Sequence, residues 1–405
     1  MKLLARTYMP FTLGVAVVLT ASCARHAEFR FAQTPTSHEP GTIARVERLG
    51  GYSATTLRLL MWWADLPERM RVEHGVSLYR IEYWTRNYDG SPTVASGLFA
   101  VPKKAALQGV VSYQHGTNPT RALTPSKPTL SEGVLASAVF AGGGYLLVAP
   151  DYIGLGSSEE LHPYLHTPST TGAVIDMLRA SRVLCEQLGR QCPDSIYLTG
   201  FSQGGHATVA TLKELEKLED PRLRVVASAA VAAPCDLDGR AFPFALSTHG
   251  TFYLAYLTNA YCRVYGHPIE SVLATPYSEQ VPVLFDGNHT PDEILTALPQ
   301  NARDIFSKEF LEAYDSGQPT WLLSAIAENA VEPWPCTVPL RLYYGTGDVD
   351  VSPAEAPSFA QRVTERGGHA TPICVGDYDH NGSMFHAVPR IRQWFDEFSE
   401  PMHSR

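Results

Sequence analysis

A serine flanked by glycines is the most informative chemical feature of this 405-residue chain. Ser202 lies in the pentapeptide 200–204 (Gly-Phe-Ser-Gln-Gly), after an apolar run at residues 196–199 and before a segment with helical character. A serine at a sharp strand-to-helix turn exposes its hydroxyl, and small neighbours keep that turn uncrowded. The pattern predicts a nucleophile for covalent catalysis, although so short a motif also arises by chance and depends on its structural context.

A carboxylate and a histidine that could activate this serine follow later in the chain. Asp348 comes just after the apolar run 340–344, and His380 follows the run 371–375. In hydrolases with a nucleophile elbow, the chain order is serine, acid, histidine, with the last two on loops after late strands. We expect His380 to take the proton of Ser202, and Asp348 to hold the other ring nitrogen.

Three other ionisable residues near these positions are weaker candidates. Asp350 competes with Asp348 for the role of the acid, and otherwise it is a solvated or loop-bracing carboxylate. His386 lies inside a predicted closing helix, where a histidine is usually packed or solvated. His206 is expected one turn into the helix after the serine, pointing away from the sheet edge.

A tetrahedral intermediate also needs two hydrogen-bond donors for its oxyanion. The backbone N–H of Gln203 follows the nucleophile, and the loop 114–118 is expected to supply the second donor, with Thr117 as the candidate. His115 is expected to shape this loop rather than to act as a base. Asp151 precedes the serine, so we expect it to brace a glycine-containing turn instead of acting as the triad acid.

Strands and helices that alternate along the chain can bring these residues to one sheet edge. Strands are expected at residues 76–84, 93–101, 109–113, 145–149, 195–199, 225–232, 338–344 and 371–375, and helices at 173–188, 206–218, 354–366 and 384–395. The first two strands flank a turn-forming sequence and predict a hairpin. The later alternation predicts an α/β fold with a mostly parallel central sheet flanked by helices.

Residues 236–334 interrupt this alternation with helical and aromatic segments, so they are interpreted as an inserted, mainly helical cap. Within it, aromatic and apolar side chains recur every three or four residues, at Phe252, Tyr253, Tyr256, Leu257, Tyr261 and Tyr265. They are expected to share one helical face, which either lines an acyl pocket or packs on the core.

Four stretches resemble α/β-hydrolases of the secreted serine esterase and lipase group, close to the secretory lipase family. They are residues 112–117 (Ser-Tyr-Gln-His-Gly-Thr), 149–156 (Ala-Pro-Asp-Tyr-Ile-Gly-Leu-Gly), 200–207 (Gly-Phe-Ser-Gln-Gly-Gly-His-Ala) and 344–348 (Tyr-Gly-Thr-Gly-Asp). The resemblance implies an α/β-hydrolase fold, hydrolysis of carboxylic esters without cofactor or metal, and a cap that shapes the acyl pocket. The core would comprise residues 42–235 and 335–405. The oxyanion loop departs from the His-Gly-Gly-Gly form of many lipases, which leaves the second donor open.

The N-terminus is interpreted as an export signal. Residues 1–22 combine a basic start with an apolar run at 11–19 that is too short to span a bilayer stably. Cys23 ends a sequence that resembles the lipobox of bacterial lipoproteins, and ordinary cleavage near Ala24 is the alternative. Residues 23–41 are polar and read as a tether. We therefore expect an exported protein, either a periplasmic or outer-membrane lipoprotein or a secreted one, whose only membrane contact is the N-terminal lipid.

Cysteine content and net charge narrow the remaining possibilities. Apart from Cys23 the chain has six cysteines, enough for up to three disulfides in an oxidising compartment, and Cys185 with Cys192 is the favoured pair because it would close a short turn. The alternative is that several of the cysteines are buried free thiols. No zinc-type cysteine spacing occurs. The net charge of −9, without a cluster of basic residues, excludes a nucleic-acid partner.

The leading functional prediction is hydrolysis of a small-molecule or lipid ester through an acyl-enzyme on Ser202. A serine peptidase of the same fold is the first alternative, because a triad cleaves both esters and amides. The second alternative is a non-catalytic surface binding protein. The complete set of triad residues argues against it.

Overall fold

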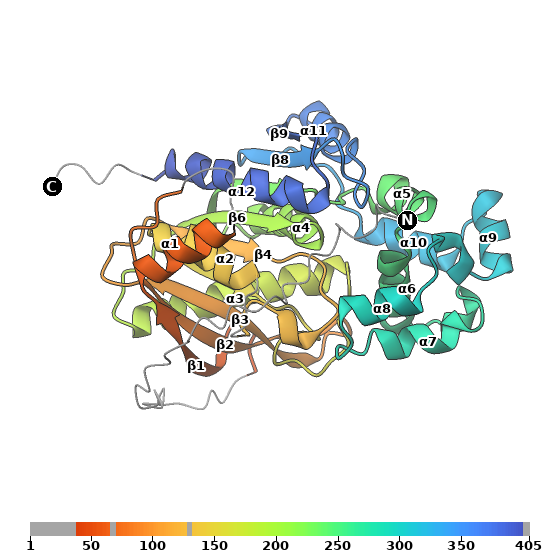
Figure 1. Ribbon diagram of the computed structural model, residues 1–405, viewed down its shortest axis with the longest axis horizontal. Coiled ribbons are helices and arrows are strands. Elements are labelled where there is room, and N and C mark those ends of the chain that lie inside the picture. The colour runs from red at the N-terminus through yellow and green to blue at the C-terminus, as the bar shows by residue number, and fades with distance from the viewer. Residues whose placement is uncertain (1–37, 65–69, 128–131, 400–405) are drawn as a thin grey trace. The chain divides into compact units, whose positions relative to one another are not determined.

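The computed structural model describes residues 38–64, 70–127 and 132–399 (Figure 1). The predicted signal at 1–22, the lipidation candidate Cys23 and most of the predicted tether at 23–41 lie outside these residues, so they remain predictions. Within the described ranges, no helix combines the length and apolar character that a bilayer crossing requires.

The described residues form one nine-stranded sheet. Its strands are β1 (Ile43–Tyr52), β2 (Val76–Arg86), β3 (Pro92–Pro102), β4 (Val110–Gln114), β5 (Leu146–Pro150), β6 (Ser195–Phe201), β7 (Arg224–Val231), β8 (Leu340–Gly345) and β9 (Ala370–Gly376). They lie in the order β1-β2-β3-β5-β4-β6-β7-β8-β9. The pairs β1–β2, β2–β3 and β3–β5 are antiparallel. The remaining pairs, from β5–β4 through to β8–β9, are parallel. The predicted, mostly parallel sheet is confirmed.

Helices cover both faces of the sheet. Those of the core are α1 (Ala54–Trp63), α2 (Glu132–Val139), α3 (Thr167–Gln187), α4 (Gln203–Leu218), α11 (Glu355–Glu365) and α12 (His380–Asp396). Residues of α1, α2 and α12 share one buried cluster with alternate residues of β3, β4 and β5. Helices α3 and α4 contribute nothing to that cluster; they pack against each other and against the sheet from its other side. Because both faces are covered, β4 and β5 are buried along their whole length.

The chain between β7 and β8 is mainly helical, as predicted for residues 236–334. It contains α5 (Phe242–Ser247), α6 (Thr251–Tyr265), α7 (Tyr277–Leu284), α8 (Pro291–Ala297), α9 (Lys308–Asp315) and α10 (Trp321–Asn329). These helices gather beyond one end of the strands (Figure 1) and form a second hydrophobic cluster with Tyr164 and Leu165 of the core. We call this segment the cap; its boundaries as a separate domain remain a prediction.

Several local features differ from the prediction. The strand β1 and the helices α1 and α2 were not predicted from the sequence. Among the described strands β1 pairs only with β2, and its residues are half-buried without strict alternation, so it lacks the period that identifies strands. The closing helix begins at His380 rather than at 384, because the carboxylate of Asp379 accepts the Gly382 N–H as its N-cap.

The predicted Cys185–Cys192 disulfide is wrong for this structure. Each cysteine in the described ranges carries a free thiol. Interaction between the two thiols raises the pKa of Cys185 and lowers that of Cys192. The short turn after α3 therefore brings the two thiols near each other, as the spacing suggested, without a covalent bond between them.

Candidate active site

The candidate nucleophile lies on the turn between β6 and α4. Ser202 has a φ of +56° and a ψ of −119°, a conformation that costs about 1–3 kcal/mol for a residue with a side chain. Its backbone N–H donates to the carbonyl of Val231, 2.9 Å away on the neighbouring strand. A Cβ at Gly200 would collide with the Gly204 carbonyl, and one at Gly204 with the Gln114 carbonyl. Both glycines are thus required for a turn this tight, and it projects the serine hydroxyl outward.

The candidate acid and base are hydrogen-bonded to each other. Nδ1 of His380, after β9, lies 2.8 Å from Oδ2 of Asp348, after β8, and both side chains are buried. The other oxygen of Asp348 accepts the backbone N–H groups of Asp350 and Val351, at 2.9 and 3.0 Å. Because both carboxylate oxygens are engaged, the acid is held in place. With Nδ1 donating to it, Nε2 of His380 is left as the proton acceptor.

The imidazole lies next to the nucleophile elbow. The ring of Phe201 packs on that of His380, with a centroid separation of 4.6 Å. Within the described residues, the hydrogen bond of the His380 ring goes to Asp348 and not to Ser202 Oγ; contacts between nucleophile and base often shorten only when substrate binds. Burial opposes the charge on His380, but the hydrogen bond and charge of Asp348 and the nearby Asp350 and Asp379 outweigh it and raise its pKa.

Gln203 is the first residue of α4, so its backbone N–H has no acceptor within the helix and is placed as an oxyanion donor would be. Its side-chain Nε2 lies 2.8 Å from Nε2 of His162. Nδ1 of His162 lies 2.8 Å from the Ile153 carbonyl, to which it donates, so Nε2 accepts from Gln203. Burial lowers the pKa of His162 to about 4, which keeps the ring neutral. Sequence reasoning missed His162, because no motif links it to the elbow.

Thr117 lies in the loop after β4, and this loop is held from two sides. The Thr117 hydroxyl is 2.9 Å from the hydroxyl of Tyr164. The carboxylate of Glu132 accepts the Gly116 N–H at 3.1 Å and the Tyr113 hydroxyl at 2.8 Å. The Gly116 N–H is therefore already engaged. The backbone N–H of Thr117 is the better candidate of the two for the second oxyanion donor.

Two polar residues near the loop have the bracing roles expected of them. The carboxylate of Asp151 accepts hydroxyl hydrogen bonds from Ser96 and Ser126 and is buried. Nε2 of His115 lies 3.2 Å from the Asp151 carbonyl, and its Nδ1 lies 2.7 Å from the Gly116 carbonyl. Both side chains stabilise the loops around the site and lie outside the proposed proton path.

The remaining histidine candidates are engaged elsewhere. Nε2 of His206, on α4, lies 3.0 Å from the Asn329 carbonyl at the end of α10. Burial lowers its pKa to about 4. The ring of His386 stacks on Tyr378, with 3.6 Å between centroids.

A cavity of about 540 Å³, including the space at its mouth, opens at Ser202. Tyr253 and Leu257 of α6 line it, together with other cap residues that are mostly apolar. Tyr256 and Tyr261, on the same helix, are instead buried in packing contacts. Both interpretations of this helix therefore hold: some of its side chains line the cavity, and others are buried in packing contacts.

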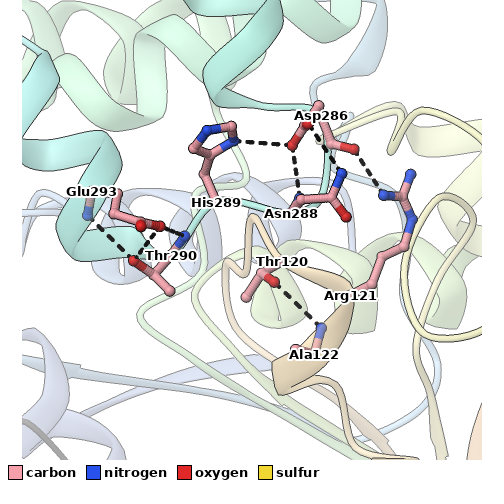
Figure 2. Close-up of polar contacts among 8 residues, drawn as sticks. All are labelled: Thr120, Arg121, Ala122, Asp286, Asn288, His289, Thr290 and Glu293. Atoms are coloured by element: carbon pink, nitrogen blue, oxygen red, sulfur yellow. Dashed lines mark hydrogen bonds and ion pairs between the residues drawn. The ribbon is translucent and has the colours of Figure 1, made fainter.

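One arginine, Arg121, joins the cap to the segment that follows the loop 114–118, and Figure 2 shows its contact with Asp286. Nη1 of Arg121 donates to the carbonyl of Asp286 at 2.8 Å, and its backbone N–H donates to the Gly287 carbonyl at 2.9 Å. Its Nε donates to the carbonyl of Ser158 at 2.9 Å. Its guanidinium thus links the loop after Thr120 to the cap and to the segment after β5, a role that no sequence motif indicated.

One group of side chains within the described ranges has the spacing of metal ligands. Oxygens of Asp348 and Asp350 and a nitrogen of His380 lie within 4.8 Å of one another. Both oxygens of Asp348 already accept hydrogen bonds, and Nδ1 of His380 donates to one of them. The arrangement fits an acid–base pair better than a cation site.

No family model matches the chain, and no curated protein matches it. Solved structures of other proteins, however, are similar to it. A provisionally assigned hydrolase from Legionella pneumophila shares 30% sequence identity with this chain, with a TM-score of 0.84. The similarity covers 90% of this chain and 100% of the Legionella protein. The ligand-bound form of the rice cell wall degrading esterase LipA from Xanthomonas oryzae shares 23% identity over 89% of this chain and 100% of its own, with a TM-score of 0.82.

Candida antarctica lipase A, in its closed state, shares 15% identity over 90% of this chain and 84% of its own, with a TM-score of 0.65. At such identities LipA and the Candida lipase are evidence of the fold alone. The Legionella protein is similar over its whole length at higher identity. Taken with the nine-stranded sheet and the serine on its elbow, these findings show that the chain belongs to the α/β-hydrolase family.

Proposed function

We propose that this hydrolase cleaves carboxylic esters through an acyl-enzyme on Ser202. The observation that carries the proposal is the buried pair of His380 and Asp348, 2.8 Å apart, on the loops next to a strained serine. The apolar cavity at the serine suits an acyl group. The solved esterases and lipases that share the fold agree with this chemistry.

In the proposed reaction, Nε2 of His380 accepts the hydroxyl proton as Ser202 attacks the ester carbonyl. Asp348 stabilises the imidazolium that forms. The backbone N–H groups of Gln203 and Thr117 stabilise the oxyanion. His380 then protonates the leaving alcohol. In the second half of the reaction His380 takes a proton from a water that attacks the acyl-enzyme, and returns it to Ser202 as the acid leaves.

Ser202→Ala tests the nucleophile. We expect kcat/KM on p-nitrophenyl esters to fall by roughly 10⁴-fold or more, and labelling by a fluorophosphonate to be lost. Ser247→Ala is the matched control, since Ser247 is exposed on the cap and bonds only to the Phe244 carbonyl. Undiminished esterase activity in Ser202→Ala would show that the site is wrong, and faster turnover of aminoacyl anilides than of esters would favour a peptidase.

A further inference from the structure

The cavity at Ser202 contains a single acidic side chain. Among the described residues that line it, Asp350 alone carries a carboxyl, amino or guanidinium group. The other polar side chains there are the hydroxyls of Ser202, Tyr164 and Tyr253. An isolated carboxylate in an otherwise apolar cavity is costly unless it is hydrogen-bonded or functional.

The position of Asp350 is set by the catalytic acid. Its backbone N–H donates to Oδ1 of Asp348 at 2.9 Å, and its side chain hydrogen-bonds to Tyr253 of the cap. A carboxylate oxygen of Asp350 lies within 4.8 Å of a nitrogen of His380. The proposed triad does not need this carboxylate, because both oxygens of Asp348 are already engaged. Asp350 therefore faces the reacting centre and the cavity together, without a part in proton transfer.

We propose that Asp350 makes the acyl cavity charge-selective, so that it accepts neutral and cationic acyl groups and excludes acyl groups that carry a carboxylate. The inference rests on the proposed function and names the substrate class of the same site. Its physical basis is Coulombic: a second charge bound in the cavity lies a few ångströms from Asp350, where water screens it poorly. Like charge is repelled there, and a cation is attracted.

The test compares esters that differ only in charge. Monoethyl succinate is the anionic substrate, and ethyl isocaproate is its neutral analogue of similar shape. The ethyl ester of γ-trimethylammonio butyrate is the cationic substrate, and its neutral analogue has carbon in place of nitrogen. Hydrolysis is followed by pH-stat titration at about pH 8, since burial raises the pKa of Asp350 and the carboxylate must be ionised.

In Asp350→Asn we expect the anionic-to-neutral ratio of kcat/KM to rise about tenfold and the cationic-to-neutral ratio to fall about tenfold. Ratios are used because any effect on His380 alters both esters of a pair equally. Asp379→Asn is the matched control: Asp379 also acts on the charge of His380 but does not line the cavity, so both ratios should stay unchanged.

Two ratios that stay at wild-type values in Asp350→Asn, or that move in the same direction, would overturn the proposal, because a charge effect must have opposite signs for the two ions. Equal changes in Asp379→Asn would overturn it as well. Ser202→Ala is assayed in parallel on ethyl isocaproate. Loss of turnover there shows that the ratios report on this site, whereas retained turnover would refute the proposed function itself and the assignment of Asp350 with it.

Discussion

At the scale of single residues, the site is governed by the charges around one imidazole. Asp348 bonds to His380 directly, and Asp350 and Asp379 lie close enough to act on it through space. Burial alone would favour the neutral ring, but these carboxylates together raise the pKa of His380 above its usual value of 6.5. A general base works in its neutral form, so activity should rise with pH through this raised pKa.

Asp379→Asn should move that rise to lower pH. The substitution removes one negative charge near His380 and so lowers the pKa of the ring, while asparagine keeps the helix N-cap that Asp379 provides. The measurement is the pH profile of kcat/KM. Asp315→Asn, on an exposed cap residue paired with Arg303, is the control and should leave the profile in place. A shift to higher pH in Asp379→Asn would contradict this account of His380.

At the scale of elements, the cap is tied to the core beside the oxyanion loop. The guanidinium of Arg121 reaches carbonyls of the cap and of the segment after β5, and its backbone N–H bonds to Gly287. Just beyond, a capping box between Thr290 and Glu293 begins α8 (Figure 2). The loop that contains Thr117 is thus positioned partly by the cap, although the two are far apart in the sequence.

Arg121→Ala should lower the free energy of unfolding by about 2 kcal/mol, because several carbonyls lose a charged donor. We also expect kcat to fall, since the oxyanion loop loses a support. Urea unfolding and steady-state kinetics measure the two effects. Arg303→Ala, which removes an exposed ion pair on the cap, should change stability by no more than about 0.5 kcal/mol. Equal effects of the two substitutions would show that Arg121 is an ordinary surface residue.

At the scale of the whole molecule, a buried carboxylate lies where the chain leaves the sheet for the cap. Oε1 of Glu355, at the start of α11, accepts the Asp236 N–H at 2.7 Å. Arg362 and Arg240 both pair with the carboxylate of Asp236. Burial raises the pKa of Glu355 from 4.5 to about 7, so the folded protein holds a proton that the unfolded chain releases.

This proton makes stability depend on pH. Because the folded pKa is the higher one, the stabilisation is complete below about pH 4.5 and is lost as the pH rises through 7, by roughly 3 kcal/mol in all. In urea unfolding, Glu355→Gln, which cannot ionise, should be more stable than wild type at pH 8 and nearly equal to it at about pH 4. Glu365→Gln, exposed on the same helix, is the control. A Glu355→Gln protein that is no more stable at pH 8 would refute this ionisation.

Local sequence patterns were sufficient to predict the α/β architecture and the loops that carry the chemistry. Strand and helix periods are local patterns, and parallel strands end at a common edge, so Ser202, Asp348 and His380 could be assigned to neighbouring loops without coordinates. The close pairing of Asp348 with His380 fits that assignment. The export signal and the lipidation of Cys23 stay predictions.

The side chains that surround those loops could not be predicted in the same way, because they are brought there by packing between distant segments. The sequence leaves Asp350 as a competitor for the role of the acid, yet its side chain lines the cavity, and it is Asp348 that pairs with His380. The contacts of His162 with the elbow and of Arg121 with the cap join segments more than 40 residues apart, as the separations of 41 and 165 residues show. Such contacts leave no period in the sequence, since they depend on how distant elements pack and not on the conformation of any one of them.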